Sequence, residues 1–215
     1  MGKRDSSKEI GGHEMKTAIM IGDSHSQLVF PFLTDRLPFR YEEITSKPGW
    51  GIAKYLQDGN LQDLPTDDVA IIALGGNNRD MNLQSYGETL ERFLDLLSTK
   101  VERVVWIGPY HSTDDSVNDR HNSTNSFLKM LLPVSVGYVD VYDLSKSIPK
   151  RDKVHFDTAG YKDIVSKIEK KVKTLSTSIL PRVWLSHQKV VTPLMFFVPS
   201  FMLELFIPLF GEYYG

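Results

Sequence analysis

Short apolar runs alternate with longer amphipathic segments along most of this chain. Five runs rich in β-branched residues predict strands, over Lys16–Ile21, Arg40–Ile44, Val69–Leu74, Arg103–Ile107 and Gly137–Val141. The third and fourth are almost continuously apolar, which is typical of strands buried on both faces of a parallel sheet. The second carries more polar residues and is therefore expected at an edge of the sheet.

Between these runs, apolar residues recur at helical spacing. This spacing predicts helices over Tyr86–Leu97, Asn118–Leu132 and Thr158–Leu175. Strands that alternate with helices indicate a parallel sheet with crossover helices. We therefore expect an α/β fold, a three-layer α/β/α sandwich with a five-stranded parallel sheet of the flavodoxin-like kind.

The pattern predicts one domain over residues 15–178, with a segment of different character on each side. Residues 1–14 are polar and are expected to be a disordered lead-in. They lack the apolar core of a signal peptide, which favours a cytoplasmic or virion-associated protein. Residues 179–215 form an apolar C-terminal extension.

Within this extension, residues 190–210 are apolar apart from Thr192, Ser200, Glu204 and three prolines. The length matches the roughly 20 residues of a membrane span. The prolines and Glu204 argue against a regular helix in hydrocarbon. Two alternatives stay open, an extension packed on the domain or on a second subunit, and an extension that associates with a membrane.

Composition and charge exclude several classes of function. The chain has 215 residues, of which 41% are apolar and 24% charged, and its formal net charge is −2. Acidic and basic residues are interspersed along the chain, so its charge pattern does not indicate nucleic acid as a partner. There is no cysteine, which rules out a disulfide framework, a thiolate nucleophile and a zinc site built on cysteine.

The first candidate for chemistry follows the first predicted strand. Gly22, Asp23 and Ser24 come directly after it, so Ser24 is expected at the strand's carboxyl end, where parallel sheets hold their sites. Gly22 permits a sharp turn, and the next helix would direct backbone N–H groups towards an anion near Ser24. Alone, the triplet is equally typical of a helix cap.

Two further blocks follow predicted strands. Gly76 and Asn77 come after the third strand, where Asn77 can direct an amide donor into a cleft. Asp152 precedes His155 by three residues after the fifth strand, so that its carboxylate can accept the Nδ1 proton and leave Nε2 free for a serine. Each block alone is also typical of an ordinary loop.

Taken with Gly49, which follows the second strand, these blocks resemble the SGNH hydrolases, also called GDSL esterases. The resemblance implies that Ser24 is the nucleophile, that His155 is the general base, and that Asp152 orients it. It also implies the SGNH hydrolase fold over the predicted domain.

The resemblance further implies an oxyanion hole formed by the N–H groups of Ser24 and Gly49 and by the side chain of Asn77. Gly51 is a rival to Gly49 because the glycine block is short. The family usually has Asp after the oxyanion Asn, and here the residue is Asn78, which puts the support of that loop in doubt. No cofactor and no metal is implied.

The expected function is that of a serine esterase that hydrolyses a carboxylic ester, with an O-acetyl group on a carbohydrate as the favoured substrate. A non-catalytic carbohydrate-binding relative and an O-acyltransferase with the same triad are the alternatives.

His25 is expected to line the site or to be half exposed. His111, His121 and the nearby acids show no metal-binding spacing, and we expect a solvated loop there. Trp106 is expected in the core, and Trp50 and Tyr110 are candidates to line the cleft.

Overall fold

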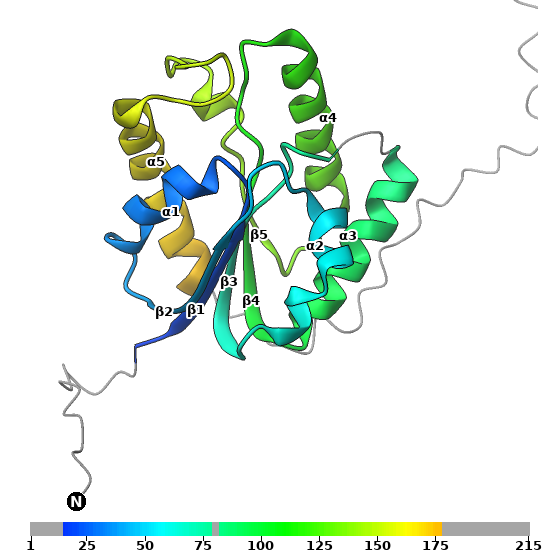
Figure 1. The fold of residues 1–215 in the computed structure, drawn as a ribbon. Helices are drawn as coiled ribbons and strands as arrows, with labels where there is room; N and C mark the ends of the chain where they lie inside the picture. Colours follow the sequence, from blue (N-terminus) through cyan, green and yellow to red (C-terminus); the bar gives the residue numbers. More distant parts are fainter. Residues whose placement is uncertain (1–14, 79–81, 178–215) are drawn as a thin grey trace, which may run out of the picture.

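The computed structural model describes residues 15–78 and 82–177 as an α/β sandwich around one parallel sheet (Figure 1). The sheet has five strands in the order β2-β1-β3-β4-β5, all parallel. Its strands are β1 (Thr17–Gly22), β2 (Arg40–Ser46), β3 (Asp67–Ala73), β4 (Val101–Ile107) and β5 (Gly137–Val139). The predicted fold class is confirmed, and so is the edge position of the polar second strand.

Five α-helices connect and cover the strands. They are α1 (Ser26–Thr34), α2 (Ile52–Asp58), α3 (Leu83–Ser98), α4 (Asp115–Leu131) and α5 (Thr158–Thr177), with short 3-10 turns at Asn60–Asp63 and Asp143–Ser145. Helices α1 and α5 lie on one side of the sheet, and α2, α3 and α4 on the other (Figure 1). This arrangement gives the three layers expected from the sequence.

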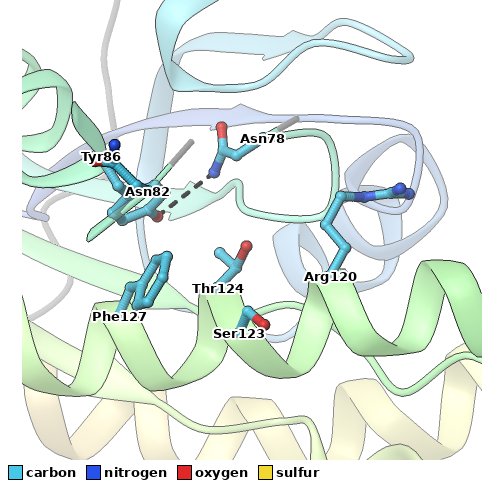
Figure 2. A pocket seen from close by; sticks show the side chains of 7 residues that line it. All are labelled: Asn78, Asn82, Tyr86, Arg120, Ser123, Thr124 and Phe127. Atoms are coloured by element: carbon cyan, nitrogen blue, oxygen red, sulfur yellow. Dashed lines mark hydrogen bonds between the residues drawn. The ribbon is translucent and has the colours of Figure 1, made fainter. Parts of the chain in front are cut away.

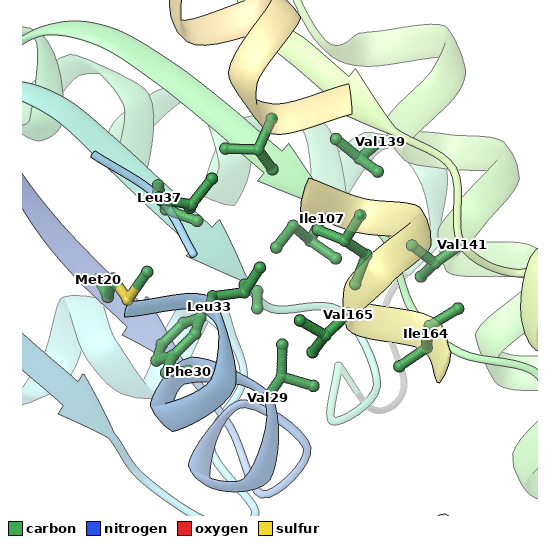
Figure 3. Close-up of a cluster of buried hydrophobic side chains, with 14 of the residues drawn as sticks. Met20, Val29, Phe30, Leu33, Leu37, Ile107, Val139, Val141, Ile164 and Val165 are labelled. Carbon is green, nitrogen blue, oxygen red and sulfur yellow. The ribbon is translucent and has the colours of Figure 1, made fainter. Parts of the chain in front are cut away.

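Each face of the sheet carries its own apolar core. Side chains of α1 and α5 pack on one face, including Phe30, Leu33, Ile164 and Val165 (Figure 3). The other face is covered mainly by α2 and α3 and contains Trp106, which is fully buried as expected. Burial on both faces explains the continuous apolar runs Val69–Ala73 in β3 and Val104–Ile107 in β4.

The bounds of the elements differ from the expected ones in physically understandable ways. Helix α4 begins at Asp115, three residues before the expected start at Asn118, because the Asp114 side chain accepts the N–H of Val117 and caps the helix. Helix α3 begins at Leu83, three residues before the expected Tyr86, because the Asn82 side chain caps it by accepting the N–H of Ser85. The lead-in over residues 1–14 and the extension over residues 179–215 lie outside the described residues, so their predicted character stays a prediction.

Candidate active site

The candidate site begins at the turn between β1 and α1. A β-carbon on Gly22 would overlap the hydroxyl and β-carbon of Ser26, so only glycine lets α1 pack this closely against the end of the strand. Ser26 donates its hydroxyl to the carbonyl of Asp23 at 2.6 Å, and the Tyr55 hydroxyl donates to the Gly22 carbonyl at 2.6 Å. Ser24 thus lies in a turn that hydrogen bonds hold on both sides.

Ser24, His155 and Asp152 form a continuous chain of hydrogen-bonded side chains. Ser24 Oγ lies 3.0 Å from His155 Nε2, and the two residues are 131 positions apart in the sequence. On the other side of the ring, His155 Nδ1 lies 3.0 Å from Asp152 Oδ2 and 3.2 Å from Oδ1. The structure therefore brings together all three residues expected to form a triad.

Backbone contacts of Asp152 keep its carboxylate ionised. The N–H groups of His155 and Val154 donate to Asp152 Oδ1 at 2.7 and 3.2 Å. Together with the His155 side chain, these bonds hold the pKa of Asp152 well below its usual value. Because this carboxylate can only accept a hydrogen bond, it fixes His155 in the tautomer with its proton on Nδ1.

The loop that holds Asp152 and His155 is tied to the connection between β4 and α4. Lys153 has a φ of 67°, an uncommon conformation for a residue with a side chain. Its carbonyl accepts the N–H of Thr113 at 2.9 Å and the hydroxyl of Ser112 at 3.0 Å. A further bond runs from the N–H of Arg151 to the carbonyl of His155 at 2.7 Å and closes the loop on itself.

His25 is buried beneath His155 instead of lining the surface of the site. Its ring stacks on Tyr110 at 4.5 Å and lies 4.8 Å from the ring of His155. Nδ1 lies 3.1 Å from the Tyr161 hydroxyl, while Nε2 has no partner among the described residues. Burial, and then the neighbouring His155, lower the pKa of His25 well below its usual value, so this ring stays neutral. Tyr110, a candidate to line the cleft, is likewise buried.

The side chain of Asn77 lies next to the nucleophile turn. Its Nδ2 is 3.3 Å from Asp23 Oδ2 and 3.4 Å from the carbonyl of Trp50. Both distances are at the long end of the hydrogen-bond range, so the amide is only weakly held by the protein. Asn78 instead is buried, and its Oδ1 accepts the N–H of Ile52 at 3.0 Å, which fastens the loop to α2. Asn78 therefore supports the loop at the position where SGNH hydrolases usually have Asp.

Of the two candidate glycines, Gly51 lies against the Asn77 turn and Gly49 does not. A β-carbon on Gly51 would overlap Asn78 Oδ1 and lie 3.0 Å from the carbonyl oxygen of Asn77. Gly49 is exposed, has a φ of 75°, and a β-carbon there would meet no atom within 4 Å. Neither the N–H of Gly51 nor that of Ser24 donates to another described residue.

Asp23 is a buried carboxyl group that sequence reasoning did not single out. It is 4% exposed, and burial raises its pKa from 3.8 to about 7, although the N–H of His25 donates to Oδ1 at 3.0 Å and opposes the shift. The sequence does contain a signal for the burial of Asp23. Asp23 is the middle residue of a Gly-Asp-Ser triplet that directly follows a buried strand, which places it under the turn.

The segment around His111 and His121 differs from the expected solvated loop. His121 belongs to α4, is buried, and its Nδ1 lies 2.6 Å from the carbonyl of Tyr110. Within residues 15–78 and 82–177, no cluster of His, Asp or Glu is arranged to hold a metal ion. Over the same residues, no helix has both the length and the apolar character needed to cross a bilayer.

No protein-family model and no curated protein matches this chain, whereas solved structures share its fold. The C-terminal catalytic domain of Streptococcus pneumoniae peptidoglycan O-acetyltransferase A is 18% identical, covering 74% of this chain and 94% of that domain at a TM-score of 0.58. A catalytic mutant of Axe2, an acetylxylan esterase from Geobacillus stearothermophilus, is 15% identical at a TM-score of 0.56, covering 73% and 94%. A protein of Slackia heliotrinireducens described as an SGNH hydrolase is 11% identical at 0.56, covering 74% and all of that chain. The described domain therefore has the SGNH hydrolase fold.

Proposed function

We propose that this chain of SGNH hydrolase fold is a serine esterase that acts through an acyl-enzyme. The observation that carries the proposal is the uninterrupted contact from Asp152 through His155 to Ser24. A serine hydroxyl is a weak nucleophile until a neighbouring base accepts its proton, and here the base has its acceptor nitrogen 3.0 Å from the hydroxyl.

In the proposed reaction, His155 Nε2 removes the proton as Ser24 Oγ attacks the ester carbonyl. The same proton then passes to the leaving alcohol, and water activated by His155 hydrolyses the acyl-enzyme in a second round. Asp152, held as a carboxylate, stabilises the imidazolium that forms in each round. His25 is neutral and therefore adds no positive charge beside that imidazolium.

Three donors are proposed to meet the oxyanion. They are the N–H of Ser24, the N–H of Gly51 and the side-chain amide of Asn77. We place Gly51 in this role instead of Gly49 because Gly51 packs against the Asn77 turn and its N–H is uncommitted. Donors of this kind each contribute roughly 10²–10³ to kcat when they meet the charge of the transition state.

The proposed substrate is an O-acetyl ester of a carbohydrate. Support comes from two neighbours in fold, one an acetylxylan esterase and the other a peptidoglycan O-acetyltransferase. The second neighbour also keeps acetyl transfer as a competing function. The two reactions share the acyl-enzyme and differ only in whether water or a sugar hydroxyl removes the acyl group.

The test combines labelling with a chain-length series. Wild-type protein and the Ser24→Ala variant are exposed to a fluorophosphonate probe and to p-nitrophenyl esters from acetyl to dodecanoyl. We expect labelling and acetyl-ester hydrolysis by the wild type, loss of both in the variant, and a fall in rate with longer chains. A wild-type protein that neither labels nor hydrolyses any of the esters would refute the esterase.

Transfer is distinguished from hydrolysis by following the acetyl group. The protein is incubated with acetylated xylo-oligosaccharide and an unacetylated oligosaccharide of different length, and the masses of both saccharides are measured by mass spectrometry. Free acetate alone supports the esterase, whereas acetyl groups on the acceptor support the transferase.

A further inference from the structure

A pocket of about 410 Å³ lies beside Asn78, between the start of α3 and the middle of α4. This size is within the range of small-molecule sites. Arg120, Thr124 and Phe127 line it from one face of α4, at helical spacing. Asn78, Asn82 and Tyr86 face them from the other side (Figure 2). The triad does not use this pocket, so its lining needs a separate explanation.

Arg120 is the cationic side chain among the described residues that line this pocket, and most of its hydrogen-bonding capacity is unused by them. Its Nε donates to the carbonyl of Gly76 at 3.1 Å, and the side chain reaches from α4 towards that turn (Figure 2). Among the described residues it forms no ion pair and no other hydrogen bond. A guanidinium carries five donors in a planar fork, and the two terminal nitrogens of Arg120 have no partner in residues 15–78 and 82–177, so they can bind a planar anion.

The other lining groups combine free polar atoms with an aromatic wall. Asn82 uses its Oδ1 to cap α3, while its Nδ2 has no partner among the described residues. The Thr124 hydroxyl likewise forms no hydrogen bond within the described part of the chain. Phe127 lies 5.6 Å from Tyr86, ring centre to ring centre, and gives the pocket an apolar side. The polar groups of Arg120, Asn82 and Thr124, together with the aromatic ring of Phe127, suit a sugar ring, which has hydroxyls at its rim and C–H groups on its faces.

We propose that this pocket binds a carboxylate-bearing sugar residue of the substrate, with Arg120 on the carboxylate. The proposal rests on the esterase function and narrows its substrate to an acidic saccharide. Arg120, which has no ion-pair partner within the described part of the chain, matches the single negative charge of a carboxylate. Arg120 contacts Gly76, the residue before Asn77, so a sugar held there lies next to the turn that carries an oxyanion donor.

The test measures binding, so that it does not depend on turnover. The full chain carrying Ser24→Ala is titrated by calorimetry with tetragalacturonate and with its fully methyl-esterified form, which has the same rings and no charge. The titrations are repeated after adding Arg120→Gln, and, as a matched control, Arg40→Gln. Arg40 lies on the exposed face of the edge strand β2 and pairs with Glu42.

We expect the acidic tetramer to bind about tenfold more tightly than its ester, as one charged contact would give. Arg120→Gln should abolish this preference, and Arg40→Gln should retain it. Equal binding of the two ligands, or a preference that survives Arg120→Gln, would overturn the proposal. If Arg120 only holds the Gly76 turn, its loss weakens both ligands equally and leaves the ratio unchanged, which also overturns it.

The test of the acidic-sugar pocket can fail independently of the test of the esterase function. Failure of fluorophosphonate labelling at Ser24 in the wild type would refute the esterase while leaving the binding ratio measurable. Labelling together with an unchanged ratio in Arg120→Gln would refute the acidic-sugar pocket alone.

Discussion

The buried Asp23 should make the stability of this protein fall as the pH rises from about 4 to about 7. Burial raises the pKa of this carboxyl group from 3.8 to about 7, so the unfolded chain loses the proton at a lower pH than the folded one. Between these values the folded state holds more protons, and stability therefore decreases with rising pH. The contribution is fully present below about pH 4 and is lost as the pH passes 7.

Asp23→Asn removes this dependence. A difference of about three pKa units, at 1.36 kcal/mol each, amounts to about 4 kcal/mol. We therefore expect the free energy of unfolding of the wild type, minus that of the variant, to fall by about 4 kcal/mol between pH 4 and pH 8. The amide keeps an oxygen for the N–H of His25 but presents a second donor to Asn77, so kcat should also decrease.

The assay is urea unfolding followed by tryptophan fluorescence at intervals of one pH unit. Asp35→Asn, which removes an exposed carboxylate at the end of α1, serves as the control. Two curves of stability against pH that run parallel for wild type and Asp23→Asn would refute the assignment of a raised pKa to Asp23.

Three other changes follow from the site and from the sequence. Asn77→Ala should lower kcat by roughly 10²–10³ with little change in KM, measured on p-nitrophenyl acetate, since the donor acts mainly in the transition state; an unchanged kcat would assign the oxyanion hole to other groups. Asp152→Asn should lower kcat by roughly 10³–10⁴ by stabilising the wrong tautomer of His155, and a loss under tenfold in the same assay would contradict that role. Deletion of residues 181–215 should leave Ser24 labelling intact and change the oligomeric state or liposome binding, followed by size-exclusion chromatography and flotation. Unfolding of the shortened protein would place the extension in the core.

The fold could be predicted because its signals are local. Apolar runs such as Val69–Leu74 and the spacing in Thr158–Leu175 each indicate an element without knowledge of the rest of the chain. The proximity of Ser24 to His155 then followed from one rule, that parallel strands present their carboxyl ends at the same edge. Helix α1 gave a weaker signal, since it has nine residues and contains Pro31.

What the sequence could not predict depends on contacts between distant segments. Gly49 and Gly51 are two residues apart, and only the packing of α2 on Asn78 distinguishes the exposed one from the buried one. The burial of His25 depends on Tyr110 and Tyr161, both far along the chain. Arg120 is one arginine among several until the turn at Gly76 is placed beside it.

The acid and base of the site lie three residues apart in a loop that closes on itself, whereas the nucleophile lies 131 positions away. The Asp152–His155 pair can therefore form early, because little chain entropy is lost in closing so short a segment. Contact between His155 and Ser24 joins segments that precede α5 and α1, which are packed together in the fold, so we expect this contact to form later than the Asp152–His155 pair. In refolding experiments, we therefore expect Ser24 labelling to recover more slowly than the fluorescence change that accompanies burial of Trp106 in the sheet. Its rate would then report the last assembly step of the sandwich.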